Sequence, residues 1–202
     1  MFITFEGIDG SGKSTQIGHL KEQLEREEIS VSLFRDPGGP ELSEKIRDLL
    51  LNSSYEVDDV TELLLFSSSR SQLVAEEVLP KLKSGSIVML DRFYDSTVAY
   101  QGYGRASVEL DKIHQMNKIA SHGRAPDLTI YMKISLEEAQ KRMARKKRDR
   151  IERAGDGFFQ KVIAGFDELA ASNDRFFTVD ATLPEKEVRD LIWGRVQKEL
   201  NN

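Results

Sequence analysis

The chain has 202 residues, enough for one domain with a full core, and its 39% hydrophobic and 31% charged residues are those of a globular protein. No cysteine is present, which excludes disulfides, zinc–thiolate sites and thiol nucleophiles, and the net charge of -5 argues against nucleic-acid binding. The N-terminus has no signal-peptide pattern, and the apolar runs are far shorter than the roughly 20 residues of a membrane span. We therefore expect one cytoplasmic domain, residues 1–202, that binds neither nucleic acid nor membranes.

The apolar pattern predicts strands that alternate with helices along the chain. Short apolar runs predict strands at residues 2–6, 30–34, 86–93, 127–134 and 176–180. Helices are expected around residues 17–24, at 42–50, at 60–82, after the capping box of Ser135 and Glu138, and at 185–200. This alternation is typical of an α/β fold with a parallel sheet.

The first strand is followed by "GIDGSGKST", which matches the phosphate-loop pattern G-x-x-x-x-G-K-[ST] at every fixed position. In such a loop the backbone N–H groups surround phosphate oxygens, and the next helix begins with its positive end toward them. The lysine reaches the β- and γ-phosphates, and the hydroxyl after it ligates Mg²⁺. The predicted ATP-binding residues are Gly7, Ile8, Asp9, Gly10, Ser11, Gly12, Lys13, Ser14 and Thr15.

Two sequence signals distinguish the classes of phosphate-loop protein: a base-recognition motif and the residues at the end of the strand around 86–93. A GTPase switch would carry N-K-x-D, but the nearest match is "NKIA" at 117–120. A motor ATPase would end this strand in Asp-Glu, whereas here it ends in Asp91-Arg92, and an arginine suits an anionic second substrate. A small-molecule kinase is favoured. The absence of an evident carboxylate base favours a phosphate over a sugar hydroxyl as acceptor.

Five blocks in order, "FEGIDGSGKST", "RDPGG", "LFSSSRSQ", "LDRFYDSTVAYQG" and "RDRIE", resemble the thymidylate kinase family. The resemblance implies a P-loop nucleoside-monophosphate-kinase fold, a five-stranded parallel sheet surrounded by helices, and a homodimer. It implies transfer of phosphate from ATP to dTMP with Mg²⁺. A kinase for another nucleoside monophosphate or a nucleoside, and a nucleotide-binding switch without transfer activity, remain the alternatives.

The resemblance also assigns roles to individual residues. For dTMP, Asp9 would bind the 3′-hydroxyl and Arg35, Arg47 and Arg92 the phosphate, Phe66 would stack on thymine, and Arg70 would donate to its O4. Thr97 and Gln101 would complete the base contacts, and Tyr100 would crowd the 2′ position. Ser14 and Asp91 would hold Mg²⁺, and Ala181 and Thr182 would lie at the adenine.

The basic run near "KRMARKKRDRIER" predicts a mobile lid over ATP at about residues 141–156. Gly10 stands where one branch of the family has an arginine, so the chain resembles the bacterial branch, in which the lid supplies that arginine. Lys13 and Arg92 would then act in catalysis together with a lid arginine, for which Arg145, Arg148 and Arg150 are candidates. One departure is Asp36, which stands where the family usually has glutamate.

Overall fold

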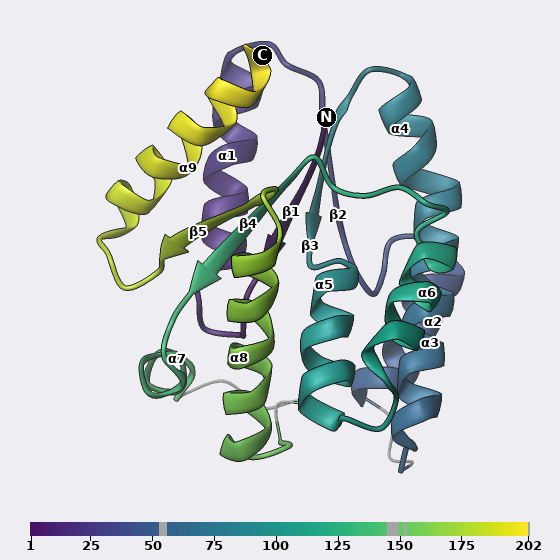
Figure 1. Cartoon of the computed structure of the whole chain (residues 1–202). Coiled ribbons are helices and arrows are strands. Elements are labelled where there is room, and N and C mark those ends of the chain that lie inside the picture. Colours follow the sequence, from purple (N-terminus) through teal and green to yellow (C-terminus); the bar gives the residue numbers. More distant parts are fainter. Residues whose placement is uncertain (53–55, 145–149, 152, 202) are drawn as a thin grey trace.

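The computed structural model describes residues 1–52, 56–144, 150–151 and 153–201. Its strands form one parallel sheet in the order β2-β3-β1-β4-β5 (Figure 1), which confirms the predicted fold class. The strands are β1 (Phe2–Glu6), β2 (Val31–Arg35), β3 (Ile87–Asp91), β4 (Leu128–Lys133) and β5 (Phe176–Asp180).

Helical segments connect these strands. They are α1 (Lys13–Arg26), α2 (Glu41–Asn52), α3 (Asp59–Leu73), η1 (Val74–Val78), α4 (Leu79–Lys83), α5 (Tyr94–Thr97), η2 (Val98–Arg105), α6 (Leu110–Ala120), α7 (Leu136–Met143), α8 (Asp156–Ser172) and α9 (Glu185–Leu200). The segments η1 and η2 are π-helical turns that continue the preceding helices. None of the helices in the described parts of the chain is long and apolar enough to cross a membrane.

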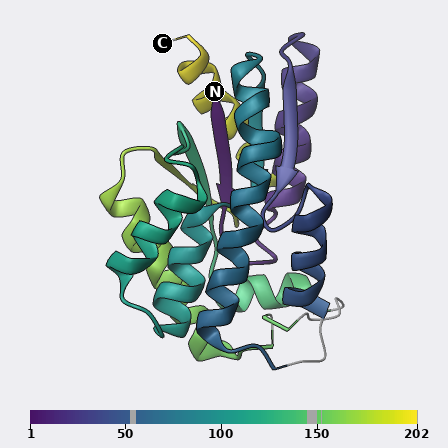
Figure 2. The same ribbon diagram turned by 90° about the vertical axis from the view of Figure 1, so that its right-hand side faces the viewer.

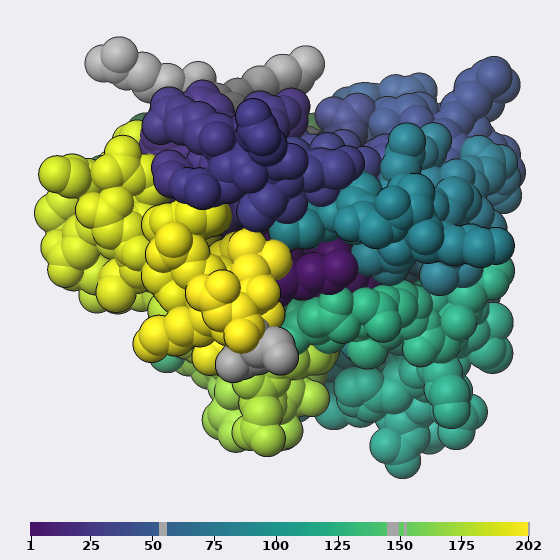
Figure 3. Space-filling model, turned by 90° about the horizontal axis from the view of Figure 1, so that it is seen from above, coloured from purple at the N-terminus to yellow at the C-terminus, as the bar shows by residue number. Residues whose placement is uncertain are grey.

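The sheet buries both faces because successive side chains of each strand point to opposite sides. Phe2 at the start of β1 packs with Val88 of β3 and with Val74 and Val78 of η1. The next residue, Ile3, belongs to the larger core that contains the apolar side of α1. Seen from above in Figure 3, the dark purple N-terminal residues are enclosed by the yellow C-terminal helix and by teal and green segments.

The carboxyl ends of the strands place the functional residues. Phe5 of β1 lies beside Asp91 of β3 and beside Ile130 of β4 in the register. The phosphate loop and the Asp91-Arg92 pair therefore leave the sheet at the same edge. Ligands of open α/β sheets bind at this edge, next to the point where the chain changes direction across the sheet.

Two regions differ from the sequence prediction. The single helix expected at 60–82 is interrupted by the π-helical turn η1, which ends just before Pro80. Proline has no N–H group to donate within the helix, and the backbone hydrogen bonds ahead of it have the wider spacing of a π-helix. Helices α5 and α8 and the π-helical segment η2 lie where no element is expected. For α8 a signal was present, since Phe159, Val162 and Phe166 fall on one helical face, but the basic run ahead of it hides its start.

Candidate active site

The phosphate loop closes tightly around a buried lysine. Lys13 begins α1, and its Nζ donates to the carbonyl oxygens of Gly7 and Ile8 at 2.9 and 3.0 Å. Gly7 and Gly10 have positive φ values of 133° and 85°, and an added Cβ would lie 2.7 and 2.6 Å from backbone oxygens of β4 and α7. Side chains at these two positions would push the loop away from the sheet.

The loop is an electropositive site. Burial and, to a smaller extent, the neighbouring Arg92 lower the pKa of Lys13 from 10.5 to about 8, although the carboxylates of Asp9 and Asp91 act in the opposite direction. A phosphate chain would supply the anionic partner that favours the charged form of this lysine. The N–H groups at the start of α1 add to the attraction for anions.

Ser14 and Asp91 offer oxygen ligands for a magnesium ion. The Ser14 Oγ lies 3.4 Å from Asp91 Oδ2, beside the phosphate loop. Mg²⁺ prefers hard oxygen ligands and is usually held by one or two protein groups together with substrate phosphates and water. The described residues contain no group of three or more His, Asp or Glu side chains able to hold a metal by themselves. The pair fits magnesium that arrives with a nucleotide.

Arg92 is held in an unusual backbone conformation at the end of β3. Its φ is 69°, a region that costs free energy for residues other than glycine, and its N–H donates to Phe5 O at 2.9 Å. The guanidinium donates from Nη2 to Asp9 Oδ1 at 2.9 Å and from Nη1 to Ser96 Oγ at 3.2 Å. This conformation turns the side chain back toward the phosphate loop.

Glu6 supports the turn that carries Arg92, a role that the motifs do not show. Its buried carboxylate accepts from Phe93 N at 2.8 Å and from Ser96 Oγ at 2.6 Å. Burial and the neighbouring Asp95 raise its pKa to about 8, although Ser96, Arg92 and the Phe93 N–H act to lower it. The only sequence signal is an acidic residue at the end of an apolar strand.

A cavity of about 490 Å³ joins the phosphate loop to three arginines. Arg92 reaches it from β3, Arg47 from α2 and Arg35 from β2. Arg47 Nη1 donates to Pro37 O at 2.7 Å, while Arg35 pairs with Glu44 at 2.9 Å. The structure thus places the three predicted phosphate-binding arginines opposite the loop.

A second cavity, of about 110 Å³, opens beside the first and shares four lining residues with it: Asp9, Asp36, Arg47 and Arg92. Its lining includes all the residues predicted to contact the base and sugar: Phe66, Arg70, Thr97, Tyr100 and Gln101. Leu51 and Ile151 also line it, and neither was expected from the motifs. The predicted acceptor residues therefore meet in one place, although they come from three separate elements.

Arg70 is locked in place by three buried partners. Its Nε donates to Asp36 Oδ2 at 2.5 Å, its Nη1 to Asn117 Oδ1 at 3.0 Å and its Nη2 to Thr97 Oγ1 at 2.7 Å. A guanidinium has five N–H groups, so donors remain after these bonds are made. Asp36, the departure from the family pattern, is the ion-pair partner of this arginine, and Asn117 carries no motif that would reveal it.

A further cavity of about 330 Å³ lies on the other side of the loop. Ala181 lines it together with Gly10, Gly12 and Arg142, as expected for a site near adenine. Thr182 does not face it: its N and Oγ1 donate to Asp180 Oδ1 at 2.9 and 2.6 Å and close the turn after β5. Arg142 was not among the predicted residues.

The predicted lid is described only in part, because Arg145 and Arg148 lie outside the described residues. Arg150 is anchored behind the wall of the base cavity, which the next residue, Ile151, lines, and its hydrogen bonds in the described part of the chain go to α2 and α3 rather than to the phosphate loop. Its Nη2 donates to Glu62 Oε2 at 2.5 Å and its Nε to Leu50 O at 2.8 Å.

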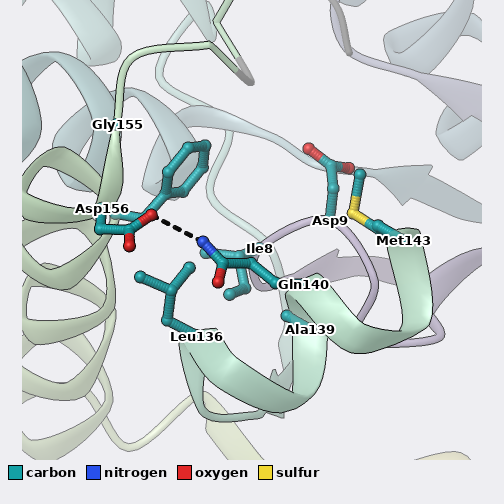
Figure 4. A pocket seen from close by; sticks show the side chains of 9 residues that line it. Ile8, Asp9, Leu136, Ala139, Gln140, Met143, Gly155 and Asp156 are labelled. Carbon is teal, nitrogen blue, oxygen red and sulfur yellow. Dashed lines mark hydrogen bonds between the residues drawn. The ribbon is translucent and has the colours of Figure 1, made fainter. Parts of the chain in front are cut away.

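The two ends of the predicted lid meet beside the phosphate loop. Gln140 of α7 donates from Nε2 to Asp156 Oδ1 of α8 at 2.7 Å, and both residues line a small apolar cavity (Figure 4). Ile8 and Asp9 of the phosphate loop line the same cavity. The first turn of α8 is therefore tied to the helix that precedes the lid.

Together the phosphate loop, the parallel sheet and the arginines that face the loop define a P-loop kinase of the nucleoside-monophosphate type. Comparison with known proteins narrows the class. The family model described as thymidylate kinase matches residues 5–192, so the chain belongs to the thymidylate kinase family.

Individual relatives agree with this family. The chain is 43% identical over 208 residues to the thymidylate kinase of Chlorobaculum parvum, with 98% of this chain and 95% of the relative covered. It is 44% identical over 200 residues to that of Thermoanaerobacter sp., with 98% of both covered. The crystal structure of thymidylate kinase from Ehrlichia chaffeensis superposes with a TM-score of 0.81 at 33% identity, with 98% of both chains covered.

Proposed function

We propose that the protein transfers the γ-phosphoryl group of ATP to dTMP, which yields dTDP. The observation that carries this proposal is the cavity in which Lys13 and Ser14 face Arg35, Arg47 and Arg92. One side of the cavity suits the phosphates of a nucleoside triphosphate, and the other suits a second, monophosphate anion. An acceptor held there lies next to the transferable phosphate.

The residues of the chain position the two phosphates and offset their charge. Lys13 would contact the β- and γ-phosphates, and Arg92 would hold the acceptor phosphate while it keeps its contact with Asp9. Mg²⁺, held by Ser14 and Asp91, would neutralise charge on the donor phosphates. No general base is required, because a phosphate monoester is already largely dianionic at pH 7.

The base cavity would select thymine. Phe66 offers a ring for stacking, and Arg70 offers donors toward the oxygen at C4. Arg70 is fixed by Asp36 and Thr97, so its guanidinium is held in one orientation before the acceptor binds.

A coupled assay of ADP release with dTMP, dUMP, dCMP, dGMP and thymidine tests the proposal. We expect turnover that depends on the acceptor, with the highest kcat/KM for dTMP. A preference for another monophosphate or for thymidine would identify a different kinase. Tight ATP binding without turnover on any acceptor would identify a nucleotide-binding switch.

We also propose that the protein works as a homodimer in the cytoplasm, as the family resemblance implies. Five large apolar side chains are exposed on three helices: Leu42 and Leu49 of α2, Val60 and Leu64 of α3, and Ile119 of α6. Helix α3 contacts both of the others, and Figure 2 shows the three side by side on the face toward the viewer. A second copy would cover this face. Light scattering should give twice the mass of one chain, and Leu49→Glu should halve it.

A further inference from the structure

The buried carboxylate of Glu62 lies behind the residues that line the base cavity. Glu62 lies on α3, four residues before Phe66 and eight before Arg70, so the three share one side of the helix. Its side chain is completely buried and accepts bonds from three residues of other segments. Such a group must be fully paired to be tolerated, and its partners are thereby fixed in place.

Gln101 connects this carboxylate to the cavity. Its side chain lines the cavity, and its Nε2 donates to Glu62 Oε1 at 2.9 Å. An ionised carboxylate can only accept hydrogen bonds, so the amide of Gln101 must turn its NH₂ group toward Glu62. The carbonyl oxygen Oε1 then lies on the other side of the amide. Glu62 therefore determines which way the amide of Gln101 is turned, whereas the two orientations of an amide are otherwise set by the hydrogen bonds around it.

Two arginines keep Glu62 ionised. Arg105 donates to Glu62 from Nε at 3.2 Å and from Nη2 at 3.1 Å, and Arg150 donates from Nη2 at 2.5 Å. Burial acts to raise the pKa of Glu62, but the bonds from Arg105, Gln101 and Arg150 outweigh it and hold the pKa below its usual value. Because Arg150 is anchored here, the neighbouring Ile151 is placed in the cavity wall.

We propose that Glu62 is a specificity-determining positioning residue, which makes Gln101 present a carbonyl acceptor to the N3–H group of the bound pyrimidine. This inference rests on the proposed function, in which the base of the acceptor fills this cavity. Thymine and uracil carry a hydrogen at N3, whereas neutral cytosine carries a lone pair there. With donors from Arg70 at C4 and an acceptor from Gln101 at N3, the site matches thymine at both positions and opposes cytosine at both.

The variant Glu62→Gln tests the inference, since a glutamine can accept or donate and no longer dictates the orientation of Gln101. The measurement is kcat/KM for dTMP and for 5-methyl-dCMP, which differ only at C4 and N3. We expect the preference for dTMP to fall on the order of 10- to 100-fold, mainly through KM. Glu62→Asp keeps a pure acceptor and should retain most of the preference.

Two controls separate positioning from a general loss of stability. Val196→Ala removes buried volume from α9, a helix that does not line the base cavity, so it should lower Tm and leave the preference unchanged. In a Gln101→Met background, Glu62→Gln should cause no further change in preference, because the group through which it acts is gone. A folded Glu62→Gln protein with the full wild-type preference, or additive effects in this cycle, would overturn the inference.

Arg105 keeps an ion pair with Asp59 at 3.3 Å when Glu62 is changed, whereas Arg150 loses its ion pair with Glu62. If Glu62→Gln unfolds for this reason, the double variant Glu62→Gln/Arg150→Gln removes both charges of that pair and is measured instead. The wild-type protein gives an independent answer. With dTMP labelled with ¹⁵N at N3, the imino proton of the bound nucleotide should be protected from exchange by its bond to Gln101. Exchange as fast as in free dTMP would contradict the inference, whereas absence of dTMP binding or turnover in the wild type would instead contradict the proposed function.

Discussion

The phosphate end and the base end of the active site are built in different ways. The phosphate loop is a run of consecutive residues, 7–15, whose shape depends on backbone conformation and on one lysine. The base cavity is assembled from α3, α5, η2 and the segment at Ile151, and buried side-chain pairs behind its wall hold these parts together. Changes at the phosphate end should therefore affect chemistry alone, whereas changes at the base end should affect specificity and stability together.

The largest effect is expected at the phosphate end. Lys13→Ala should lower kcat/KM on the order of 10³-fold, because the charge at the β- and γ-phosphates stabilises the transition state by several kcal/mol. Thermal unfolding should change less than activity, because the lost hydrogen bonds to Gly7 O and Ile8 O are offset in part by removal of a buried charge. Lys21→Ala, on the exposed side of the same helix, is the matched control. A loss under about tenfold would exclude this role for Lys13.

At the base end, substitution of Arg70 should change both substrate preference and stability, unlike substitution of Lys13. Arg70→Met removes the donors at C4, so the preference for dTMP over dCMP should shrink about 100-fold, mainly through loss of dTMP activity. Stability should fall as well, by about 3–5 kcal/mol, because Asp36 is left buried without its ion-pair partner. Steady-state kinetics with both nucleotides and denaturant unfolding measure the two effects.

A second substitution separates these two effects. Asp36→Asn in the Arg70→Met background removes the stranded charge, so part of the stability should return while the preference stays low. If the preference returned together with the stability, Arg70 would act only as a structural partner of Asp36.

The same contrast explains what could be predicted from the sequence. The phosphate loop, Asp91-Arg92 and the five strands are local patterns, and the structure has them close to the expected residues. The family resemblance assigns Ser14 and Asp91, far apart in the chain, to one magnesium ion. They lie close together in the structure because Asp91 ends β3 and the phosphate loop follows β1 at the same edge of the sheet.

The supporting layer could not be predicted in this way. Glu6, Glu62 and Asn117 are polar residues in otherwise ordinary strands and helices, and their partners lie tens of residues away. Only the packing of the helices brings these pairs together, and no spacing rule encodes it. The position of Arg150 was hidden for the same reason, because a basic run is compatible both with a solvated lid and with an anchored segment.

Glu6 offers a pH test of this supporting layer. Its pKa rises from 4.5 in the unfolded chain to about 8 in the folded protein, chiefly through burial. Between these two pH values the folded state binds the proton more strongly, so the free energy of unfolding falls as pH rises, by at most about 5 kcal/mol from this group. Glu6→Gln removes the titration, and its stability should fall less between pH 5 and pH 8.

Denaturant unfolding at several pH values measures how steeply the free energy of unfolding depends on pH in the wild type and in Glu6→Gln. Glu22→Gln on the exposed side of α1 changes the charge equally without burial and is the control. Equal slopes for wild type and Glu6→Gln would mean that Glu6 does not titrate in this range.

The smallest effect is expected for Arg150. Its substitution compares the two ends of the active site within one basic run, because Arg150 is anchored near the base cavity while Arg145 and Arg148 are predicted to act at the phosphates. The guanidinium of Arg150 binds Glu62 and the end of α2, so Arg150→Ala should raise KM for dTMP about tenfold, a loss of about 1.4 kcal/mol, with little change in kcat. Arg145 and Arg148 are predicted to act on the transferring phosphate, so their alanine variants should lower kcat with little change in this KM. Arg153, exposed in the same run, is the control and should leave both constants unchanged. If Arg150→Ala lowered kcat as strongly as the other two, Arg150 would leave Glu62 during turnover and reach the phosphates, and the anchoring role would be restricted to the nucleotide-free protein.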